Sequence, residues 1–367
     1  MKICVVGCGM QGSVAAQDLC SCEHDVTVFD NNIALLRQLK KKVNIRARQF
    51  NVKDKIKFIR VIKDFDVVLG ALPAALGSYI MDCTIKAGVD LVDMSYSADD
   101  PFLFHEKALK KKVRIIPDAG FAPGLSNVLI GEAYRQFKGL DWLKIMVGGI
   151  PLHPEPPFNY AITWSPADLI EEYTRPTRIM RRNRVETIET LSGIETIHVP
   201  KIGKLECFYT DGLRTLLKTI NAPDMEEKTI RYPGHARLFK TIIDCGFLSD
   251  TPVHCGRRLV AIRDVSMRYL SDMLKKSDNR DLSVLLIELR RKRKQRIYTV
   301  IDRYDETNRI TSMARMTAYT GSVIAQYVKK CDGFGVIAPE RLGMDAMLCN
   351  KIKSALKKRG IVIKTKS

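Results

Sequence analysis

Residues 3–12 read ICVVGCGMQG, and this stretch decides the fold of the first part of the chain. A short apolar run at residues 3–6 leads directly into a glycine turn, Gly7-x-Gly9-x-x-Gly12. Gly7 permits a tight turn, Gly9 lets the backbone approach a phosphate, and Gly12 lets the following helix pack closely against the strand. The stretch therefore predicts a strand, a phosphate-binding turn and a helix.

Outward from this stretch, short apolar runs alternate with amphipathic helical stretches. We expect strands at residues 3–6, 25–29, 45–52, 66–72, 91–94 and 113–116, with helices between them. Strands that alternate with helices over about 120 residues indicate a doubly wound parallel sheet of the Rossmann type.

Asp30 lies at the end of the second predicted strand, 18 residues after Gly12. An acidic residue at this position hydrogen-bonds the ribose hydroxyls of NAD and repels the 2′-phosphate of NADP. No arginine occupies the next six positions, so the sequence favours NAD. Because ligands bind at the carboxyl ends of such strands, we expect the nucleotide to contact Gly7, Gly9, Met10, Gln11, Gly12, Asp30, Asn31, Val52, Ala71, Leu72, Pro73 and Ser95.

The pattern changes at residues 117–127, PDAGFAPGLSN, a Pro- and Gly-rich entry into a helix that continues to about residue 137. Ser165 and Pro166 predict the start of a short helix. Strand-like stretches follow near residues 143–147, 185–197, 205–209, 282–289 and 297–302, and they predict a second α/β domain with a mixed, largely antiparallel sheet. We place the nucleotide-binding domain at residues 1–122, with 330–367 packing back on it, and the second domain at 123–329.

Composition limits the classes of protein to which the chain can belong. It has 367 residues, ten cysteines and a formal net charge of +19. The cysteine spacing gives no zinc or disulfide framework, and no apolar run approaches the ~18 residues that a membrane helix needs. A glycine turn follows the apolar start where a secretory signal would need a longer apolar core. We therefore expect a cytoplasmic protein that binds neither metal nor membrane.

Six of the seven residues at 290–296 are basic, which by composition resembles a nucleic-acid patch. The run joins two predicted strands, so a solvated hairpin loop is the better interpretation. A non-catalytic protein that binds nucleic acid is the third hypothesis for the whole chain. The complete nucleotide-site pattern disfavours it, and no nucleic-acid partner is expected.

Further motifs carry a resemblance to a known family. They read ALP at 71–73, DAGFAPGLSN at 118–127, TWSPADLIEEYTRP at 163–176, DGLR at 211–214 and RYPGH at 231–235. With the glycine turn, they resemble the saccharopine dehydrogenase-like family, and within it the archaeal and bacterial lysine 6-dehydrogenases. The likeness covers nearly the whole chain. Cys8, where alanine is more usual, and the basic surface are its departures.

The resemblance implies an NAD-dependent amino acid dehydrogenase. Its reaction would be oxidative deamination of the ε-amine of L-lysine to allysine, which cyclises to piperideine-6-carboxylate, with release of ammonia. It also implies that residues 123–329 bind this small amino acid and form a homodimer. The alternative is a saccharopine or carboxynorspermidine dehydrogenase-type enzyme, which acts on a secondary amine.

The chemistry itself asks for a general base and a cation. An ammonium of pKa about 10.4 must lose a proton before hydride can leave its carbon, and a carboxylate substrate is best held by a bidentate arginine. The candidate bases at the nucleotide-domain strand ends and in the second domain are Asp93, Asp118 and His235. The candidate substrate-binding residues are Arg175, Arg214 and Arg231.

Most of these candidates have a structural alternative. Asp118 could instead cap the following helix, and Asp93 could satisfy backbone N–H groups at its strand end. His235, in a turn beside Pro233 and Gly234, could make a structural hydrogen bond. Arg214 and Arg231 could form ion pairs between domains or subunits. The sequence leaves the identity of the base open.

Overall fold

The glycine turn lies between strand β1 (Lys2–Val6) and helix α1 (Met10–Ser21). The computed structural model describes residues 1–276 and 278–367. The chain forms two units: unit 1 contains residues 1–139, 214–220 and 314–364, and unit 2 contains residues 140–213, 221–313 and 365–367. The functional boundaries expected at residues 122 and 330 stay predictions.

Unit 1 is built on a seven-stranded sheet with the order β17-β6-β5-β4-β1-β2-β3. Every neighbouring pair in it is parallel, as in the register of Val5 opposite Val28 on one side and Leu69 on the other. The predicted Rossmann-type sheet is therefore confirmed. Its other strands are β2 (Asp25–Asp30), β3 (Arg46–Gln49), β4 (Val67–Gly70), β5 (Asp90–Asp93), β6 (Arg114–Ile116) and β17 (Gly335–Val336).

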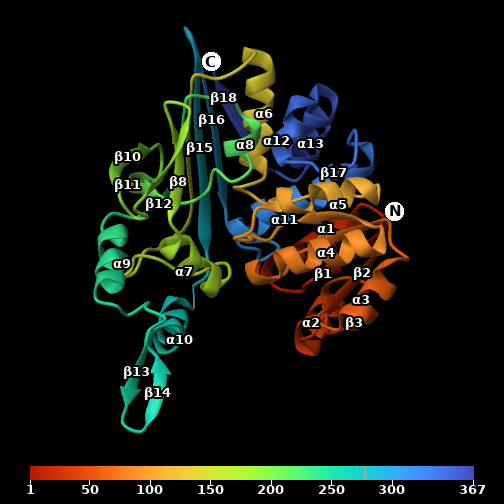
Figure 1. Ribbon diagram of the computed structural model, residues 1–367, viewed down its shortest axis with the longest axis horizontal. Helices are drawn as coiled ribbons and strands as arrows, with labels where there is room; N and C mark the ends of the chain where they lie inside the picture. The colour runs from red at the N-terminus through yellow and green to blue at the C-terminus, as the bar shows by residue number, and fades with distance from the viewer. Residues whose placement is uncertain (277) are drawn as a thin grey trace. The chain divides into compact units, whose positions relative to one another are not determined.

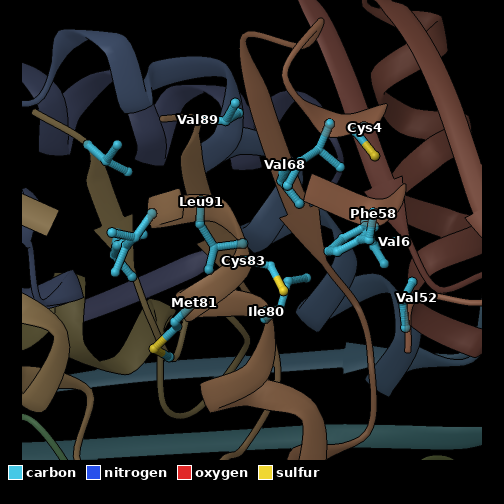
Figure 2. Close-up of a cluster of buried hydrophobic side chains, with 14 of the residues drawn as sticks. Cys4, Val6, Val52, Phe58, Val68, Ile80, Met81, Cys83, Val89 and Leu91 are labelled. Atoms are coloured by element: carbon cyan, nitrogen blue, oxygen red, sulfur yellow. The ribbon is translucent and has the colours of Figure 1, made fainter. Parts of the chain in front are cut away.

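Helices α3 and α4 bury apolar side chains against this sheet. Figure 2 shows the strand residues Cys4, Val6, Val68 and Leu91 in one cluster with the helix residues Phe58, Ile80, Met81 and Cys83. The central strands β1 and β4 are almost wholly apolar and buried because both faces of the parallel sheet are covered there, whereas the edge strand β3 is polar and mostly exposed. This core fixes the strand ends that carry the candidate residues.

The helices of unit 1 begin at local signals in the sequence. Asn32 accepts a hydrogen bond from the backbone N–H of Ala34 at the start of α2, and Asp54 does so from Lys57 at the start of α3. The helix expected between the strands at 91–94 and 113–116 is short, because Asp100 first caps a 3₁₀ turn. The helical segments are α2 (Ile33–Lys42), α3 (Lys55–Ile62), η1 (Ala74–Leu76), α4 (Gly77–Ala87), η2 (Pro101–Phe104), α5 (His105–Lys110), α6 (Leu125–Phe137), α8 (Leu216–Thr219), α11 (Ser312–Tyr327), η3 (Val328–Lys330), α12 (Pro339–Met344) and α13 (Ala346–Lys358).

Unit 2 is built on a nine-stranded mixed sheet with the main order β10-β11-β12-β7-β15-β16-β18 (Figure 1). Among the strand pairs of the described residues whose register is defined, only β12 and β7 run parallel, so the predicted mixed, largely antiparallel sheet is confirmed. Its strands are β7 (Trp142–Pro151), β8 (Thr177–Arg181), β9 (Arg184–Ile188), β10 (Glu195–Val199), β11 (Gly203–Tyr209), β12 (Asp224–Arg231), β15 (Asp281–Arg291), β16 (Lys294–Arg303) and β18 (Ile363–Lys366).

Three helices and a two-stranded hairpin complete unit 2: α7 (Pro166–Thr174), α9 (His235–Asp244), α10 (Ile262–Leu274), and β13 (Pro252–Cys255) with β14 (Arg258–Ala261). Ser165 caps α7 and Pro166 is its first residue, as predicted. Most of the basic run at 290–296 is strand, because β15 and β16 extend through it to a turn at Lys292 and Arg293. No helix in the described part of the chain is long and apolar enough to cross a membrane.

Candidate active site

The glycine turn has the geometry that its spacing predicts. Gly7 has φ +104°, and a Cβ there would meet the carbonyl oxygen of Ala71 at 2.4 Å. A Cβ on Gly12 would meet the carbonyl oxygen of Gly7 at 2.0 Å, so the first turn of α1 packs on the loop itself. A Cβ on Gly9 would meet no atom of the described residues within 4 Å. The loop is thus closed toward the sheet and open at Gly9, which suits the approach of a pyrophosphate.

Asp30 is held beside this loop at the end of β2. Its carboxylate accepts hydrogen bonds from the backbone N–H of Cys8 at 2.6 Å and of Asn32 at 2.7 Å. Each carboxylate oxygen has further lone pairs, so the group can also accept from two ribose hydroxyls. The residues therefore fit the adenosine half of a pyridine nucleotide.

Most of the other predicted nucleotide contacts follow the carboxyl ends of strands of this sheet, whereas Met10 and Gln11 begin α1. The backbone N–H of Ala71 donates to the carbonyl of Val6, which extends β4 next to the glycine turn. The carbonyls of Asn31 and Val52 accept from the side chains of Gln49 and Tyr79. Met10 and Pro73 are exposed, while Gln11 and Leu72 are half-buried. Their contacts with a nucleotide stay predictions.

Asp118 and Arg214 form a buried bidentate ion pair in unit 1. Arg214 Nε donates to Oδ2 of Asp118 at 3.2 Å, and Nη2 donates to Oδ1 at 3.1 Å. Their side chains are 4% and 1% exposed, in the order Arg214 and Asp118. Both residues adopt left-handed backbone conformations, with φ +51° and +53°. Such conformations cost about 1 kcal/mol or more and persist where the surrounding structure demands them.

This pair decides between two sequence-based interpretations of Asp118. Helix α6 starts after Gly124, and its first backbone N–H groups do not use the Asp118 carboxylate as their cap. Tyr96 joins the pair, with the Arg214 guanidinium 5.2 Å from its ring centroid. The sequence analysis missed Tyr96, although it directly follows the predicted residue Ser95.

Asp93 lies at the end of β5 and is completely buried. Its carboxylate accepts from the hydroxyl and backbone N–H of Ser95, and a Cβ on Gly70 would meet Asp93 Oδ1 at 2.3 Å. Burial raises the pKa of Asp93 to about 7, and the negative charge of Asp118 adds to this, while the Ser95 hydrogen bonds and Arg214 oppose it. Asp93 therefore stabilises its own turn, which is the structural alternative to a catalytic role. Its raised pKa also lies near neutral pH.

Unit 2 contains a directed chain of buried hydrogen bonds through His235. Arg231 Nε donates to Tyr173 Oη at 2.8 Å, and Tyr173 Oη lies 2.9 Å from Nε2 of His235. His235 Nδ1 lies 3.0 Å from the carbonyl of Phe158, which can only accept, so Nδ1 carries the proton and Tyr173 donates to Nε2. Burial and the nearby charge of Arg231 lower the pKa of His235 to about 3.

This geometry favours the structural alternative for two predicted residues. Both nitrogens of His235 have protein partners, and His235 is the first residue of α9. Arg231 is also engaged by Glu172, with Nη2 3.6 Å from Oε2, and its guanidinium lies 4.7 Å from the Tyr160 ring centroid. Catalytic or substrate-binding roles for these residues stay predictions.

Arg175 ends α7, where its backbone N–H donates to the carbonyl of Glu171. Burial raises the pKa of Glu172, and the charges of Arg231 and Arg175 oppose that rise. Glu172 and Tyr173 lie within the 163–176 motif, but neither was predicted to have a role. Among the described residues, no group of three or more His, Cys, Asp and Glu side chains could hold a metal ion.

A Rossmann unit with an open glycine turn and an acidic strand end defines a nucleotide-binding α/β protein. Two family models cover the chain: the saccharopine dehydrogenase NADP binding domain matches residues 3–121, and the saccharopine dehydrogenase C-terminal domain matches residues 120–361. The chain therefore belongs to the saccharopine dehydrogenase family, and it contains that family's pyridine-nucleotide-binding domain.

Individual relatives are distant. The chain is 23% identical over 258 residues to saccharopine dehydrogenase [NADP(+), L-glutamate-forming] of Saccharomyces cerevisiae, an alignment covering 67% of this chain and 58% of the relative. It is 24% identical over 227 residues to alpha-aminoadipic semialdehyde synthase of Arabidopsis thaliana, covering 56% of this chain and 21% of the relative. The chain thus spans 58% or less of the length of these curated relatives.

A solved structure shows the same fold. Apo saccharopine dehydrogenase (L-Glu forming) from Saccharomyces cerevisiae superposes with a TM-score of 0.79 at 17% sequence identity, covering 100% of this chain and 99% of that one.

Proposed function

We propose that the chain is a pyridine-nucleotide-dependent dehydrogenase that oxidises a C–N bond of lysine or a lysine-derived amine. The main observation is that unit 1 alone holds both an open glycine turn with Asp30 and the buried Asp118–Arg214 pair at the carboxyl ends of one sheet. A carboxylate beside a guanidinium offers both charges that an amino acid with an extra ammonium group needs. The family membership supports the same class of reaction.

The particular reaction that we propose is the oxidative deamination of the ε-amine of L-lysine. Lysine, oxidised nucleotide and water give allysine, reduced nucleotide, an ammonium ion and one further proton. The nucleotide, when bound, accepts the hydride from the carbon that bears nitrogen. The protein must therefore hold the lysine carboxylate, accept the ammonium proton and admit one water molecule.

Residues of unit 1 supply these roles. The guanidinium of Arg214 binds the substrate carboxylate, and the carboxylate of Asp118 binds the ammonium. Asp93 has a pKa of about 7, which suits a group that takes up a proton near neutral pH. The hydroxyl of Ser95 donates to Asp93, so it can pass a proton to Asp93 as it receives one from the amine. His235, with its pKa lowered to about 3, is a poor proton acceptor at neutral pH.

We propose NAD as the oxidant because Asp30 stands at the ribose position. A 2′-phosphate would meet its negative charge, which is fixed there by two backbone N–H groups. The curated relative from yeast carries NADP(+) in its name, so the nucleotide is a point on which this chain would differ from that relative.

Saccharopine is the second candidate substrate, and the names of the yeast relative and its solved structure favour it. Saccharopine has three carboxylates, so its pocket would need several available cations. Arg231 is engaged by Tyr173 and Glu172, and Arg214 is likewise engaged by Asp118. These contacts do not separate lysine from saccharopine, so the products of the reaction must do so.

One assay separates these candidates. Purified protein is given NAD or NADP with L-lysine, L-ornithine or saccharopine, and reduced nucleotide, ammonia and glutamate are measured. We expect reduction of NAD with L-lysine and release of ammonia. Glutamate formed from saccharopine would select the second candidate, and no reduction with any amine would refute both.

We also expect a homodimer, which light scattering would reveal as twice the mass of the chain.

A further inference from the structure

Glu340 is a completely buried carboxyl group on α12 that the proposed reaction does not use. Its Oε2 accepts from Asn127 Nδ2 and from Thr215 Oγ1, both at 3.0 Å, and its Oε1 accepts from Thr219 Oγ1. Burial raises the pKa of Glu340, and the three donors oppose that rise. Three donors from two different segments thus converge on one side chain. Burying a carboxyl group lowers the stability of the fold unless the group is fully hydrogen-bonded.

One of these donors, Asn127, also fixes the loop that carries Asp118. Asn127 Oδ1 accepts from the backbone N–H of Gly124 at 3.2 Å and from Ser126 Oγ at 3.0 Å. The loop is tightly folded there, since a Cβ on Gly124 would meet the carbonyl oxygen of Gly120 at 1.9 Å. The same amide group therefore connects the Asp118 loop to Glu340.

The other two donors lie on the segment that begins with Arg214. Residues 214–220 belong to unit 1, although the chain on both sides of them belongs to unit 2. Non-covalent contacts must therefore hold this segment in unit 1. The Lys218–Asp100 ion pair is too exposed to contribute much, with side chains 57% and 33% exposed. Its buried contacts include the apolar side chain of Leu216, the Arg214–Asp118 pair, the hydrogen bonds to Glu340 and a hydrogen bond from Asn127 Nδ2 to Thr215 Oγ1 at 3.3 Å.

We propose that Glu340 is a positioning residue that holds Asp118 and Arg214 opposite each other by anchoring both of their segments. The inference rests on the proposed function of these two residues. Asp118 and Arg214 both have left-handed backbone conformations, and each conformation relaxes if its segment is released. Anchoring the two segments therefore keeps both conformations in place. Glu340 acts through Asn127 on one segment and through Thr215 and Thr219 on the other.

A substitution at Glu340 should leave α12 itself in place. Helix α12 crosses α6 with backbone against backbone: a Cβ on Gly131 would meet the carbonyl oxygen of Glu340 at 2.0 Å, and one on Gly343 would meet that of Val128 at 1.9 Å. The helix crossing therefore does not depend on the carboxylate, and variants at this side chain remain testable as folded protein.

The conservative variant can restore the contacts. In Glu340→Gln the amide oxygen can accept from Asn127 and Thr215, and the amide nitrogen can donate to Thr219 Oγ1. Thr219 Oγ1 then donates to the carbonyl of Thr215, which it already approaches at 3.0 Å. Glu340→Ala leaves all three donors without this acceptor.

The experiment combines kinetics with hydrogen exchange on the full chain. We expect Glu340→Ala to lower kcat/KM for L-lysine about tenfold in the wild-type background and less than about twofold in an Arg214→Ala background, since coupled residues are not additive. Glu340→Gln should stay within about twofold of wild type. Backbone amides of residues 215–220 should exchange at least about tenfold faster in Glu340→Ala, with those of β1 to β6 unchanged.

The matched control is Lys353→Met, which removes the ion pair from Lys353 Nζ to Glu132 between α13 and α6 without touching residues 214–220. It should preserve kcat/KM and the exchange of residues 215–220. Unchanged exchange in Glu340→Ala, an equal loss in the Arg214→Ala background, or a loss in Glu340→Gln as large as in Glu340→Ala would overturn the proposal. If wild-type protein oxidises no amine, the proposed function fails, and the exchange measurement still decides the anchoring.

Discussion

Asp30 is the residue on which the choice between NAD and NADP depends. We expect Asp30→Ala to raise the KM for NAD about tenfold, because hydrogen bonds to a charged group are worth about 1.5 kcal/mol or more. The KM for NADP should fall, since the negative charge beside the 2′-phosphate is gone. Steady-state kinetics with both nucleotides measures the effect. Asp25→Asn, at the opposite end of the same strand, is the matched control, and unchanged selectivity in Asp30→Ala would mean that Asp30 does not contact the ribose.

His235 makes stability depend on pH with a defined sign. Its pKa is about 3 in the folded protein and about 6.5 when unfolded, so the folded state binds fewer protons between these values. The contribution of His235 to the free energy of unfolding is therefore present above pH 6.5 and is lost as the pH falls toward 3. The slope is at most about 1.4 kcal/mol per pH unit.

The variant His235→Gln should remove this dependence, because glutamine stays neutral. Urea unfolding of both proteins between about pH 5 and pH 7 measures the difference, in which the buried carboxyl groups cancel. His254→Gln, at an exposed position on β13, is the control and should give a constant difference. A constant difference for His235→Gln as well would mean that the pKa of His235 is the same in the folded and unfolded protein. Turnover of His235→Gln separately tests the base prediction, which expects a loss of about 10².

The candidate site was predictable where its chemistry is local in sequence. The roles of Gly7, Gly9 and Gly12 follow from spacing alone, because the turn and the helix start are adjacent. The pairing of Asp118 with Arg214 joins residues 96 positions apart, which no periodicity reveals. Both residues were predicted as candidates from the chemistry of the reaction and from their positions, but nothing in the sequence indicates that they bind each other.

At the scale of elements, the crossing of α6 and α12 depends on two glycines. In Gly131→Ala the new methyl group would meet backbone atoms of Glu340, which cannot rotate away. Overpacking costs about 1–3 kcal/mol, against which alanine gains about 1 kcal/mol of helix propensity. The balance is a net loss of about 0–2 kcal/mol in the free energy of unfolding, and we expect the upper end because the backbone atoms cannot move aside; urea denaturation measures it.

Gly321→Ala in α11 is the matched helical control. Its methyl group would meet Sδ and Cγ of Met94, which belong to a flexible side chain that can move. The loss there should be below about 1 kcal/mol. Equal losses at the two positions would contradict the rigid crossing of α6 and α12.

The elements of unit 1 were easier to predict than those of unit 2. Buried parallel strands appear as continuous apolar runs, so β1, β4 and β5 were predictable from residues 3–6, 66–72 and 91–94. The sequence analysis did not predict the hairpin of β13 and β14, whose residues are mostly exposed and therefore lack an alternating pattern. It also placed only a turn at His235, where α9 begins.

At the scale of the whole molecule, the net charge of +19 should favour the nucleotide over the amine. The positive field attracts the anionic pyrophosphate and does not attract lysine, which is itself positive. Raising the ionic strength from about 0.05 to 0.5 M should therefore raise the KM for NAD severalfold. The KM for L-lysine should stay constant or fall. Kinetics across this salt range measures both, and a KM for NAD that ignores salt would show that the charge plays no part in binding.

The composition of unit 1 from three separate stretches of chain also affects how the protein is made. Strands β1 to β6 and helix α6 lie within residues 1–139, but α12 and β17 come from residues 314–364. A ribosome must therefore synthesise the chain to about residue 344 before β17 and the partner of α6 are available. Until then, the nascent nucleotide-binding unit lacks the partner of α6, and the face of α6 around Gly131 stays uncovered during translation.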